Sequence, residues 1–474
     1  MKGINKYFFI LLAGAALASC NKALDLKPSD QIIEEKAFLN LPSLERGIVG
    51  AYQTFNQRTT TDFGSYLYDI YSTALVSDEA TLPSENNTGR GVTSYRWQID
   101  PNTADVTNAW TPYYFGIDRA NRILAAADSI AVSSSAEATT KSRIKAEAFA
   151  LRAFGHLQLL INYSNSYAPN ALAVPYVKVS ETFGKPARQT VSQVLENIRI
   201  DLDSAKKLMP ASFTTRTRMT LPAIHAIQAR AALYGKNWDL AIEAATAAIN
   251  AVPLASKEDY PKIWKDQTTS EVLWKMRREQ ANFTRAGDVF YDRSQKKIIY
   301  APSKELRDAF DKDKDIRYSS TVVLRGANRY SVGKYIGGDA SVENLADIKV
   351  FRTAEMYLIR AEAYAEKDRL LDAARDLNDL RAARVEGYVP QLFLSKQALI
   401  NAIAEERFKE LAFEGQRMGD LRRWLLPVTR LEDDAINAQG AVTLNPTDRQ
   451  YYFPIPSQEI LANENMEQNP AYLK

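Results

Sequence analysis

The spacing of apolar residues along the chain predicts a body built mainly from α-helices. In the segment 43–55, Leu44, Ile48, Ala51 and Phe55 are separated by steps of 4, 3 and 4 residues, which places them on one helix face. The segments 110–127, 142–162 and 191–208 show the same period. The pattern indicates a scaffold of amphipathic helices.

Two alanine-rich segments, 222–253 and 354–385, resemble the tetratricopeptide repeat, a hairpin of antiparallel helices. In the first segment, the small residues and a closing proline stand at the repeat spacing: Ala229, Ala232, Ala241, Ala245, Ala248 and Pro253. In the second, the matching positions are Tyr357, Ala361, Tyr364, Ala373 and Leu377. Either segment alone also fits an ordinary amphipathic hairpin, but two copies in register favour the repeat. Because repeats bury their apolar faces only by stacking, we expect both hairpins in one solenoid.

Three segments lose the helical period: 77–108, 254–350 and 425–474. The first is crowded with Ser, Asn, Thr, Gly, Pro and Asp, while residues 271–276 in the second alternate like a strand. In the third, Pro454 and Pro456 enforce an extended chain. Long ordered loops in compact proteins are often functional, so these segments are predicted to form an irregular half beside the helices.

The N-terminus has the features of a secretory signal. Lys2 and Lys6 precede an apolar run at 7–18, which is too short to span a bilayer, and the sequence Leu-Ala-Ser-Cys follows at 17–20. This ending resembles the bacterial lipobox, in which the cysteine is lipidated and becomes residue one of the mature chain. The alternative is an ordinary signal peptide with a chance cysteine. We therefore predict a signal peptide at 1–19, a lipidated Cys20 with a tether at 20–30, and a single domain at 31–474.

Composition limits the chemistry of the body and its partners. Cys20 is the only cysteine, so the exported body has no disulfide and no Cys-ligated metal. The net charge is +3, and loss of Lys2 and Lys6 with the signal leaves about +1. A net charge this close to zero does not indicate the excess of basic residues that is typical of nucleic-acid-binding proteins. No stretch after the signal is apolar enough to span a membrane, so membrane contact is expected through the lipid anchor alone.

No motif argues for an enzyme, a cofactor or a metal site. The two histidines, His156 and His225, lie in helical patterns and are interpreted as structural. Zinc-protease, nucleophile-elbow and phosphate-loop motifs do not occur. A pair of catalytic carboxylates for glycoside hydrolysis is an alternative that the sequence leaves open, because the distance between two carboxylates is not readable from sequence. The acidic residues at 405–414 are interpreted as partners of Arg407 and Arg417 in ion pairs on one helix.

The candidate site rests on aromatic rings beside polar side chains in the irregular segments. Sugars present flat C–H faces that pack on aromatic rings, while amide, carboxylate and guanidinium groups bind their hydroxyls. Two segments, 77–108 and 287–300, supply such residues: Asp78, Asn86, Asn87, Arg90, Tyr95, Trp97, Tyr291, Arg293 and Tyr300. For each ring taken singly, core packing is the favoured interpretation. The combination with loop-borne polar neighbours is what suggests a binding site.

Further motifs follow the lipobox in unbroken order. They are Leu-Asp-Leu-Lys-Pro at 24–28, Glu-Ala-Phe-Ala-Leu-Arg-Ala-Phe at 147–154, Arg-Thr-Ala-Glu-Met-Tyr-Leu-Ile-Arg-Ala-Glu-Ala at 352–363, Glu-Arg-Phe-Lys-Glu-Leu-Ala-Phe-Glu-Gly-Gln-Arg at 406–417, Phe-Pro-Ile-Pro at 453–456 and Gln-Asn-Pro-Ala-Tyr at 468–472. Together they resemble the SusD/RagB family of outer-membrane lipoproteins of Bacteroidetes. The resemblance implies a mainly α fold, with about four tetratricopeptide-like helical pairs near 31–60, 110–162, 191–253 and 351–424, beside the irregular half.

The resemblance also implies a function. Members of the family lie on the outer cell surface and deliver a captured nutrient, usually an oligosaccharide, to a SusC-like TonB-dependent transporter. A peptide-binding protein of the RagB type is the nearest alternative. A protein-interaction scaffold and a glycosidase are the others. The family motifs map to scaffold helices, so they assign no ligand contact to any residue.

Overall fold

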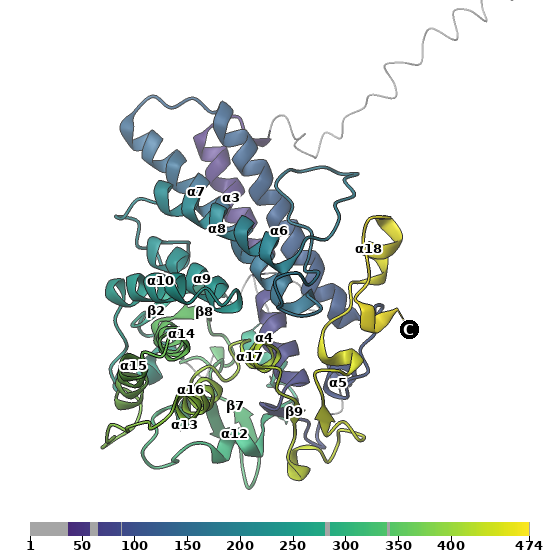
Figure 1. Cartoon of the computed structure of the whole chain (residues 1–474), viewed down its shortest axis with the longest axis vertical. Coiled ribbons are helices and arrows are strands. Elements are labelled where there is room, and N and C mark those ends of the chain that lie inside the picture. The colour runs from purple at the N-terminus through teal and green to yellow at the C-terminus, as the bar shows by residue number, and fades with distance from the viewer. Residues whose placement is uncertain (1–36, 57–64, 87, 280–284, 339–341, 474) are drawn as a thin grey trace, which may run out of the picture.

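The computed structural model of the chain describes residues 37–56, 65–86, 88–279, 285–338 and 342–473 (Figure 1). It is mainly helical, which confirms the predicted fold class. The longer helices are α3 (Leu41–Phe55), α4 (Ser65–Val76), α6 (Ala104–Ser129), α7 (Ser135–Tyr163), α8 (Val191–Leu208), α9 (Leu221–Tyr234), α10 (Trp238–Ala251), α14 (Thr353–Glu366), α15 (Leu370–Ala382), α16 (Lys396–Glu410) and α17 (Arg417–Trp424). Short helices are α5 (Val92–Tyr95), α11 (Tyr260–Ile263), α12 (Lys304–Asp308), α13 (Arg317–Thr321) and α18 (Ser457–Ala462).

Polar residues fix where several of these helices begin. The Asn40 side chain accepts a hydrogen bond from the backbone N–H of Ser43 at 3.0 Å, and Pro42 occupies the first turn of α3. Ser134 and Thr190 cap α7 and α8 in the same way. Such caps satisfy backbone donors that have no partner within the helix. In α3, the predicted face of Leu44, Ile48, Ala51 and Phe55 is fully buried, which confirms the periodicity.

The helices pack in a continuous series. α3 packs on α6, α6 on α7, α7 on α8 and α8 on α9. The two tetratricopeptide-like hairpins, α9–α10 and α14–α15, then lie directly side by side, because α10 packs against α14 (Figure 1). Segments more than a hundred residues apart in sequence are therefore neighbours in the solenoid, as predicted.

Small residues permit these close approaches. Ala241, Ala245 and Ala248 of α10 are buried, as are Ala361 of α14 and Ala373 of α15. An alanine occupies little space between two helix axes, so neighbouring backbones approach closely and the larger aromatic side chains fill the gaps between them. The twelve-residue spacing therefore places a small residue of the second helix where it packs closely on a small residue of the first.

The strands of the described residues form antiparallel pairs: β1 (Ala80–Thr81) with β5 (Ala301–Pro302), β2 (Val272–Met276) with β8 (Ile348–Arg352), β3 (Tyr291–Asp292) with β4 (Lys297–Ile298), β6 (Val322–Leu324) with β7 (Tyr330–Val332), and β9 (Val428–Thr429) with β10 (Thr443–Leu444). β8 leads straight into α14 and pairs with β2, with Val272 opposite Arg352. This pair joins the irregular half to the helices. One hydrophobic core extends across both halves, from Leu44 to Met466.

Two features differ from the sequence expectation. The helix α4 was not predicted, because residues 66–76 are buried on all sides of the helix and its polar residues Asp69, Ser72 and Thr73 form no exposed face, so there is no amphipathic stripe to detect. The helix expected from residue 110 begins at Ala104 instead. Among the residues described, no helix is both long and apolar enough to span a membrane.

The acidic residues at 406–414 form a buried ion network, but the predicted pairs were wrong. α16 ends at Glu410, and Phe413 has a positive φ of 58°, so Glu414 and Arg417 do not share a helix with Arg407. Arg407 pairs with Asp420 instead, at 2.7 Å. The network joins carboxylates to arginines and a lysine from distant segments: Glu271, Glu406, Glu410 and Glu414 with Arg317, Lys334, Arg352 and Arg384.

Candidate functional site

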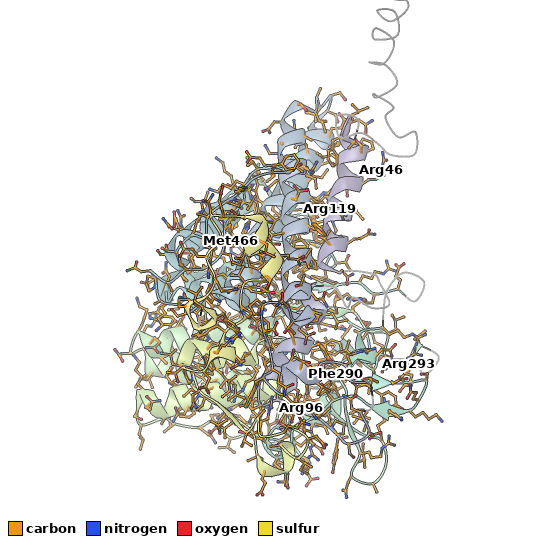
Figure 2. The ribbon with its side chains drawn as sticks, turned by 90° about the vertical axis from the view of Figure 1, so that its right-hand side faces the viewer. Arg46, Arg96, Arg119, Phe290, Arg293 and Met466 are labelled. Atoms are coloured by element: carbon orange, nitrogen blue, oxygen red, sulfur yellow. The ribbon has the colours of Figure 1, made fainter. Side chains whose placement is uncertain are left out.

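The two segments selected for the candidate site meet in the structure. The rings of Tyr95 and Tyr300 lie 6.0 Å apart, and the Tyr300 hydroxyl donates to the carbonyl oxygen of Arg90 at 2.8 Å. The Arg90 guanidinium donates to the carbonyl of Asp288 at 3.2 Å. Segments separated by about two hundred residues therefore meet in one region, and Figure 2 shows Arg96, Phe290 and Arg293 of this region far from Arg46 and Arg119.

The aromatic candidates of these segments point into the core. Tyr95, Trp97, Tyr291 and Tyr300 are all buried. The Tyr95 hydroxyl donates to the Asp434 carbonyl at 2.6 Å, and the Trp97 indole donates to the Val76 carbonyl at 3.0 Å. These rings hold the loops to the core. Their role in stacking on a ligand stays a prediction, and their burial does not favour it.

An arginine lies over three of these four rings. Arg430 lies over the rings of Tyr95 and Trp97, at 3.9 and 4.3 Å from their centroids. Arg325 lies 4.0 Å from the centroid of Tyr291. Asp78 is buried in an ion pair with Arg417, at 2.6 Å. These contacts explain the residues as structural supports.

The remaining candidates lie at or near the surface. Asn86 accepts hydrogen bonds from the backbone and hydroxyl of Thr88 in a tight turn. Arg293 is half-buried and pairs with Asp288 at 2.9 Å; Figure 2 shows it near Phe290 on this surface. Asn87 and Cys20 lie outside the described residues.

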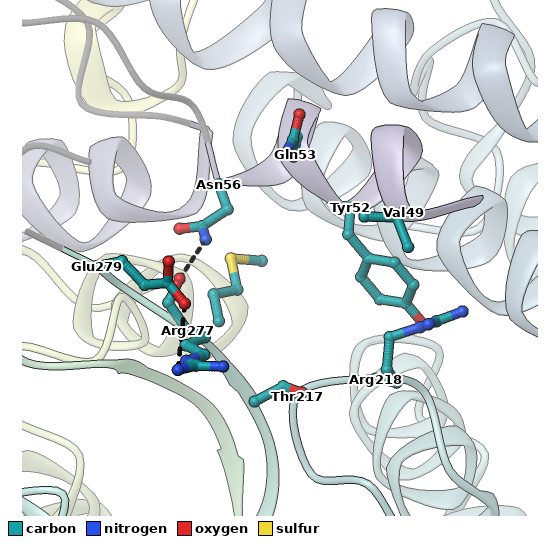
Figure 3. A pocket seen from close by; sticks show the side chains of 9 residues that line it. Val49, Tyr52, Gln53, Asn56, Thr217, Arg218, Arg277 and Glu279 are labelled. Carbon is teal, nitrogen blue, oxygen red and sulfur yellow. Dashed lines mark hydrogen bonds and ion pairs between the residues drawn. The ribbon is translucent and has the colours of Figure 1, made fainter. Parts of the chain in front are cut away.

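A second candidate site is the cavity between α3 and the end of β2 (Figure 3). We call it the Tyr52 pocket. Its volume is about 250 Å³, and it combines apolar walls with amide and charged groups at the rim. The lining residues are Val49, Tyr52, Gln53, Asn56, Thr217, Arg218, Met276, Arg277 and Glu279.

The helix period explains how α3 forms one wall. Val49, Tyr52, Gln53 and Asn56 are spaced at 3, 4 and 7 residues from the first, so they share a face next to the buried stripe. The pairing of β2 with β8 then brings Met276 and Arg277 to the opposite wall. In the sequence, the only sign of this wall is a second stripe of side chains on the helix at 43–55. The other wall of the pocket comes from residues more than 150 positions further along the chain.

An ion-pair group holds the Tyr52 ring in place. Its hydroxyl donates to Glu147 at 2.7 Å and accepts from the backbone N–H of Met219 at 2.7 Å. Arg218 donates to the same carboxylate at 2.6 Å and lies 5.2 Å from the ring centroid. Burial alone would lower the pKa of Arg218, but the charge of Glu147 raises it above its usual value, so the guanidinium stays cationic. The wall is therefore fixed in advance of binding.

The rim supplies groups for hydroxyl recognition. The Asn56 amide donates to the Arg277 carbonyl at 2.8 Å, while its own carbonyl oxygen, Oδ1, is buried without a hydrogen-bond partner among the described residues. Arg277 is 68% exposed and pairs with Glu279 at 3.1 Å. The exposed Arg277 guanidinium and the exposed Gln53 amide beside an apolar floor form the kind of site that binds a small polar molecule.

His156 packs inside the scaffold, as interpreted from the sequence. The His156 ring stacks on Tyr176 with centroids 3.8 Å apart, and its Nε2 accepts from the backbone N–H of Val177 at 3.0 Å. Burial lowers the pKa of His156 to about 3 and that of His225 to about 4. In the part of the chain that the structure describes, no group of three or more His, Cys, Asp or Glu is arranged to hold a metal.

Comparison with known families gives a consistent result over nearly the whole chain. The model described as the SusD family matches residues 221–472, and the model described as starch-binding associating with outer membrane matches residues 23–233. The first match alone covers more than half of the chain. The chain therefore belongs to the SusD family.

Relatives and solved structures agree with this family. The SusD-like protein P38 of Formosa agariphila is 22% identical and aligns over 99% of both chains. The starch-binding protein SusD of Bacteroides thetaiotaomicron is 34% identical over 128 residues, which cover 27% of this chain and 22% of that protein.

Solved structures show the same fold. A SusD superfamily protein from Bacteroides thetaiotaomicron superposes with a TM-score of 0.79 at 24% identity, covering 91% of this chain and all of that one. A SusD-like carbohydrate binding protein from Bacteroides vulgatus has a TM-score of 0.76 at 23% identity, with 90% and 98% covered.

Proposed function

We propose that the protein is a cell-surface lipoprotein that captures an oligosaccharide reversibly in the Tyr52 pocket, without catalysis. The observation that carries this proposal is the family match from residue 23 to 472. One matched model is described as starch-binding associating with outer membrane, one relative is named a starch-binding protein, and one structural neighbour is named a carbohydrate binding protein.

The Tyr52 pocket supports saccharide capture by its composition. Tyr52 and Met276 offer apolar atoms to the C–H face of a sugar ring, and the exposed side chains of Gln53 and Arg277 offer polar groups to its hydroxyls. The wall is held by the Glu147 ion pairs, so little ordering is required on binding.

The proposed anchor is Cys20, acylated after removal of residues 1–19, with a SusC-like TonB-dependent transporter as the partner that receives the ligand. Several acyl chains hold a protein firmly on a bilayer. Labelling cells with a radioactive fatty acid tests the anchor: the wild-type chain takes up label in the outer-membrane fraction, and the Cys20→Ser variant does not. Co-purification of a transporter barrel from solubilised outer membranes tests the partner.

The binding proposal is tested by titrating the full chain, purified in detergent, against a panel of oligosaccharides and a panel of peptides. We expect saturable binding of at least one oligosaccharide, which is recovered unchanged after incubation. Binding of peptides alone would favour the peptide-binding alternative. Release of shorter sugars would favour a glycosidase.

A further inference from the structure

Residues 177–186 form a strap that lies on α6 and is fixed at both ends. At the first end, the Asn121 amide of α6 donates to the Val179 carbonyl at 3.3 Å. At the second end, the Asn463 amide, which follows α18, donates to the Pro186 carbonyl at 2.8 Å. The path of the strap is therefore set by α6 and by the residues after α18.

The tip of the strap presents an aromatic ring to solvent. Phe183 is 93% exposed, and Val179 is exposed on the same strap. Two exposed lysines stand on either side of the tip: Lys178, and Lys185, which pairs with Glu464 at 3.2 Å on the surface. Because the ends of the strap are fixed, the Phe183 ring stays in water, and its transfer to an apolar environment is favourable.

The two elements that hold the strap add exposed apolar side chains of their own. Phe115 of α6 is exposed one turn before Asp118, whose carboxylate accepts from the Ser180 hydroxyl at 2.6 Å. Leu461 of α18 is exposed two residues before Asn463. We call this surface the Phe183 face. Its apolar members are Phe115, Val179, Phe183 and Leu461.

The Phe183 face lies on the same half of the molecule as the start of the described chain. α3 packs on α6, and Figure 2 shows Arg46 of α3, Arg119 of α6 and Met466, which follows α18, in the same upper half. Residues 21–36 connect Cys20 to the described chain. An extended chain of that length reaches at most about 60 Å, so an anchor at Cys20 keeps this half of the molecule close to the bilayer.

We propose that the Phe183 face lies against the lipid bilayer that holds the acylated Cys20, with the Phe183 ring among the lipid headgroups. A stable protein interface buries about 800 Å² on each partner over a matched surface. A narrow projecting tip suits a fluid lipid surface better, because lipids need no matching pocket and aromatic side chains favour the interface. The flanking lysine stems can lie on the same surface with their ammonium groups near lipid phosphates. This inference rests on the proposed acylation of Cys20.

Another apolar loop supplies a matched control position. Leu394, two residues before α16, is 98% exposed. Its loop is also held in place, because the Asn378 amide of α15 donates to the Gln391 carbonyl at 3.0 Å. In Figure 1, α15 and α16 lie in the lower half of the molecule, whereas α3, α6 and α18 lie in the upper half. Leu394 is therefore an equally exposed apolar residue on a side that we expect to face water.

Two single-cysteine variants test the contact. Cys20 is the only cysteine of the chain, so Phe183→Cys and Leu394→Cys each add one free thiol to the acylated protein. Each purified lipoprotein is labelled with the fluorophore NBD and reconstituted into vesicles of phosphatidylethanolamine and phosphatidylglycerol, with or without a lipid that carries a nitroxide quencher near its headgroup. We expect the nitroxide to reduce the emission at position 183, which is also shifted to the blue, and to leave the emission at position 394 unchanged.

The other outcomes contradict the contact. Quenching at both positions alike, at position 394 alone, or at neither position would overturn the proposal, because both replaced side chains are almost fully exposed and neither replacement disturbs the core.

The wild-type chain separates this inference from the anchor on which it rests. Acylated wild type has no free thiol and takes up no label. A labelled wild type would overturn the anchor and the membrane contact together. An unlabelled wild type without quenching at position 183 would overturn the membrane contact alone and leave the anchor and saccharide capture standing.

Discussion

Arg230 of α9 and Glu355 of α14 form a buried ion pair in which Nε lies 2.7 Å from Oε1, and this pair links the two tetratricopeptide-like hairpins. Arg230 also donates to the Val350 carbonyl at 3.0 Å and lies 3.8 Å from the Phe351 ring centroid. Val350 and Phe351 belong to β8, so a single guanidinium contacts the first hairpin, the second hairpin and the strand that joins the irregular half to the helices.

The first prediction concerns this pair. Arg230→Met leaves the Glu355 carboxylate buried without its cation, so we expect the free energy of unfolding to fall by about 3–5 kcal/mol. The double variant Arg230→Met with Glu355→Leu should lose less than the single variant, because no charge stays unpaired. Urea denaturation measures both.

A surface pair provides the control. Arg199 and Glu196 are partly exposed on α8, and Arg199→Met should cost less than about 1 kcal/mol. An Arg230→Met variant as stable as the Arg199→Met variant would show that the hairpins are not coupled through this pair.

The second prediction concerns pH. His156 is neutral in the fold, because burial lowers its pKa to about 3, whereas its usual value is 6.5. Its contribution to stability is therefore complete above pH 6.5 and is lost as the pH falls toward 3. His156→Gln does not titrate, so the stability difference between wild type and this variant should decrease by about 1.4 kcal/mol for each pH unit below 6.5.

Subtracting the free energy of unfolding of the variant from that of the wild type cancels the contributions of the other titrating groups. Burial raises the pKa of Asp69 to about 7 and that of Glu79 to about 8, which acts in the opposite direction but equally in both proteins. Urea denaturation at pH 8, 6.5 and 5 measures the effect. A difference that stays constant over this range would mean that His156 takes up its proton without unfolding.

The third prediction separates core packing from ligand contact at Trp97. Trp97→Ala should lower the free energy of unfolding by about 3–5 kcal/mol, because the ring is buried under Arg430. Trp97→Phe keeps most of the packing but loses the hydrogen bond to Val76, so it should cost less and leave oligosaccharide affinity unchanged. A folded Trp97→Phe variant that binds the oligosaccharide more weakly would show that the Trp97 ring contacts the ligand.

Much of the helical scaffold could be predicted from the sequence, because it is determined by patterns of residues that are close together along the chain. The stripe on α3 and the twelve-residue step between Ala229 and Ala241 each depend on residues close together in the sequence. α4 was missed because a helix buried on all sides has no stripe. The ion pairs of Glu410 were missed because Arg317, Arg352 and Arg384 come from three distant segments.

The residues of the candidate site stay a prediction, because the arrangement of distant segments is not readable from the sequence. The sequence shows that the loops around Tyr95 and Tyr300 contain aromatic residues, and the loops do meet. It does not show which side of a loop faces the core, and here the rings turn inward. The Tyr52 pocket joins residues from α3, the segment before α9 and the end of β2, so no single stretch of sequence contains its pattern.

Saccharide capture in the Tyr52 pocket is tested most directly by two matched arginine variants. Arg277, in the pocket, and Arg375, on α15, are each 68% exposed, and each forms one ion pair at 3.1 Å. We predict that Arg277→Ala weakens binding of a neutral oligosaccharide about 2- to 10-fold in a calorimetric titration, while Arg375→Ala binds as the wild type does. Equal affinities for wild type and both variants would contradict a ligand in this pocket.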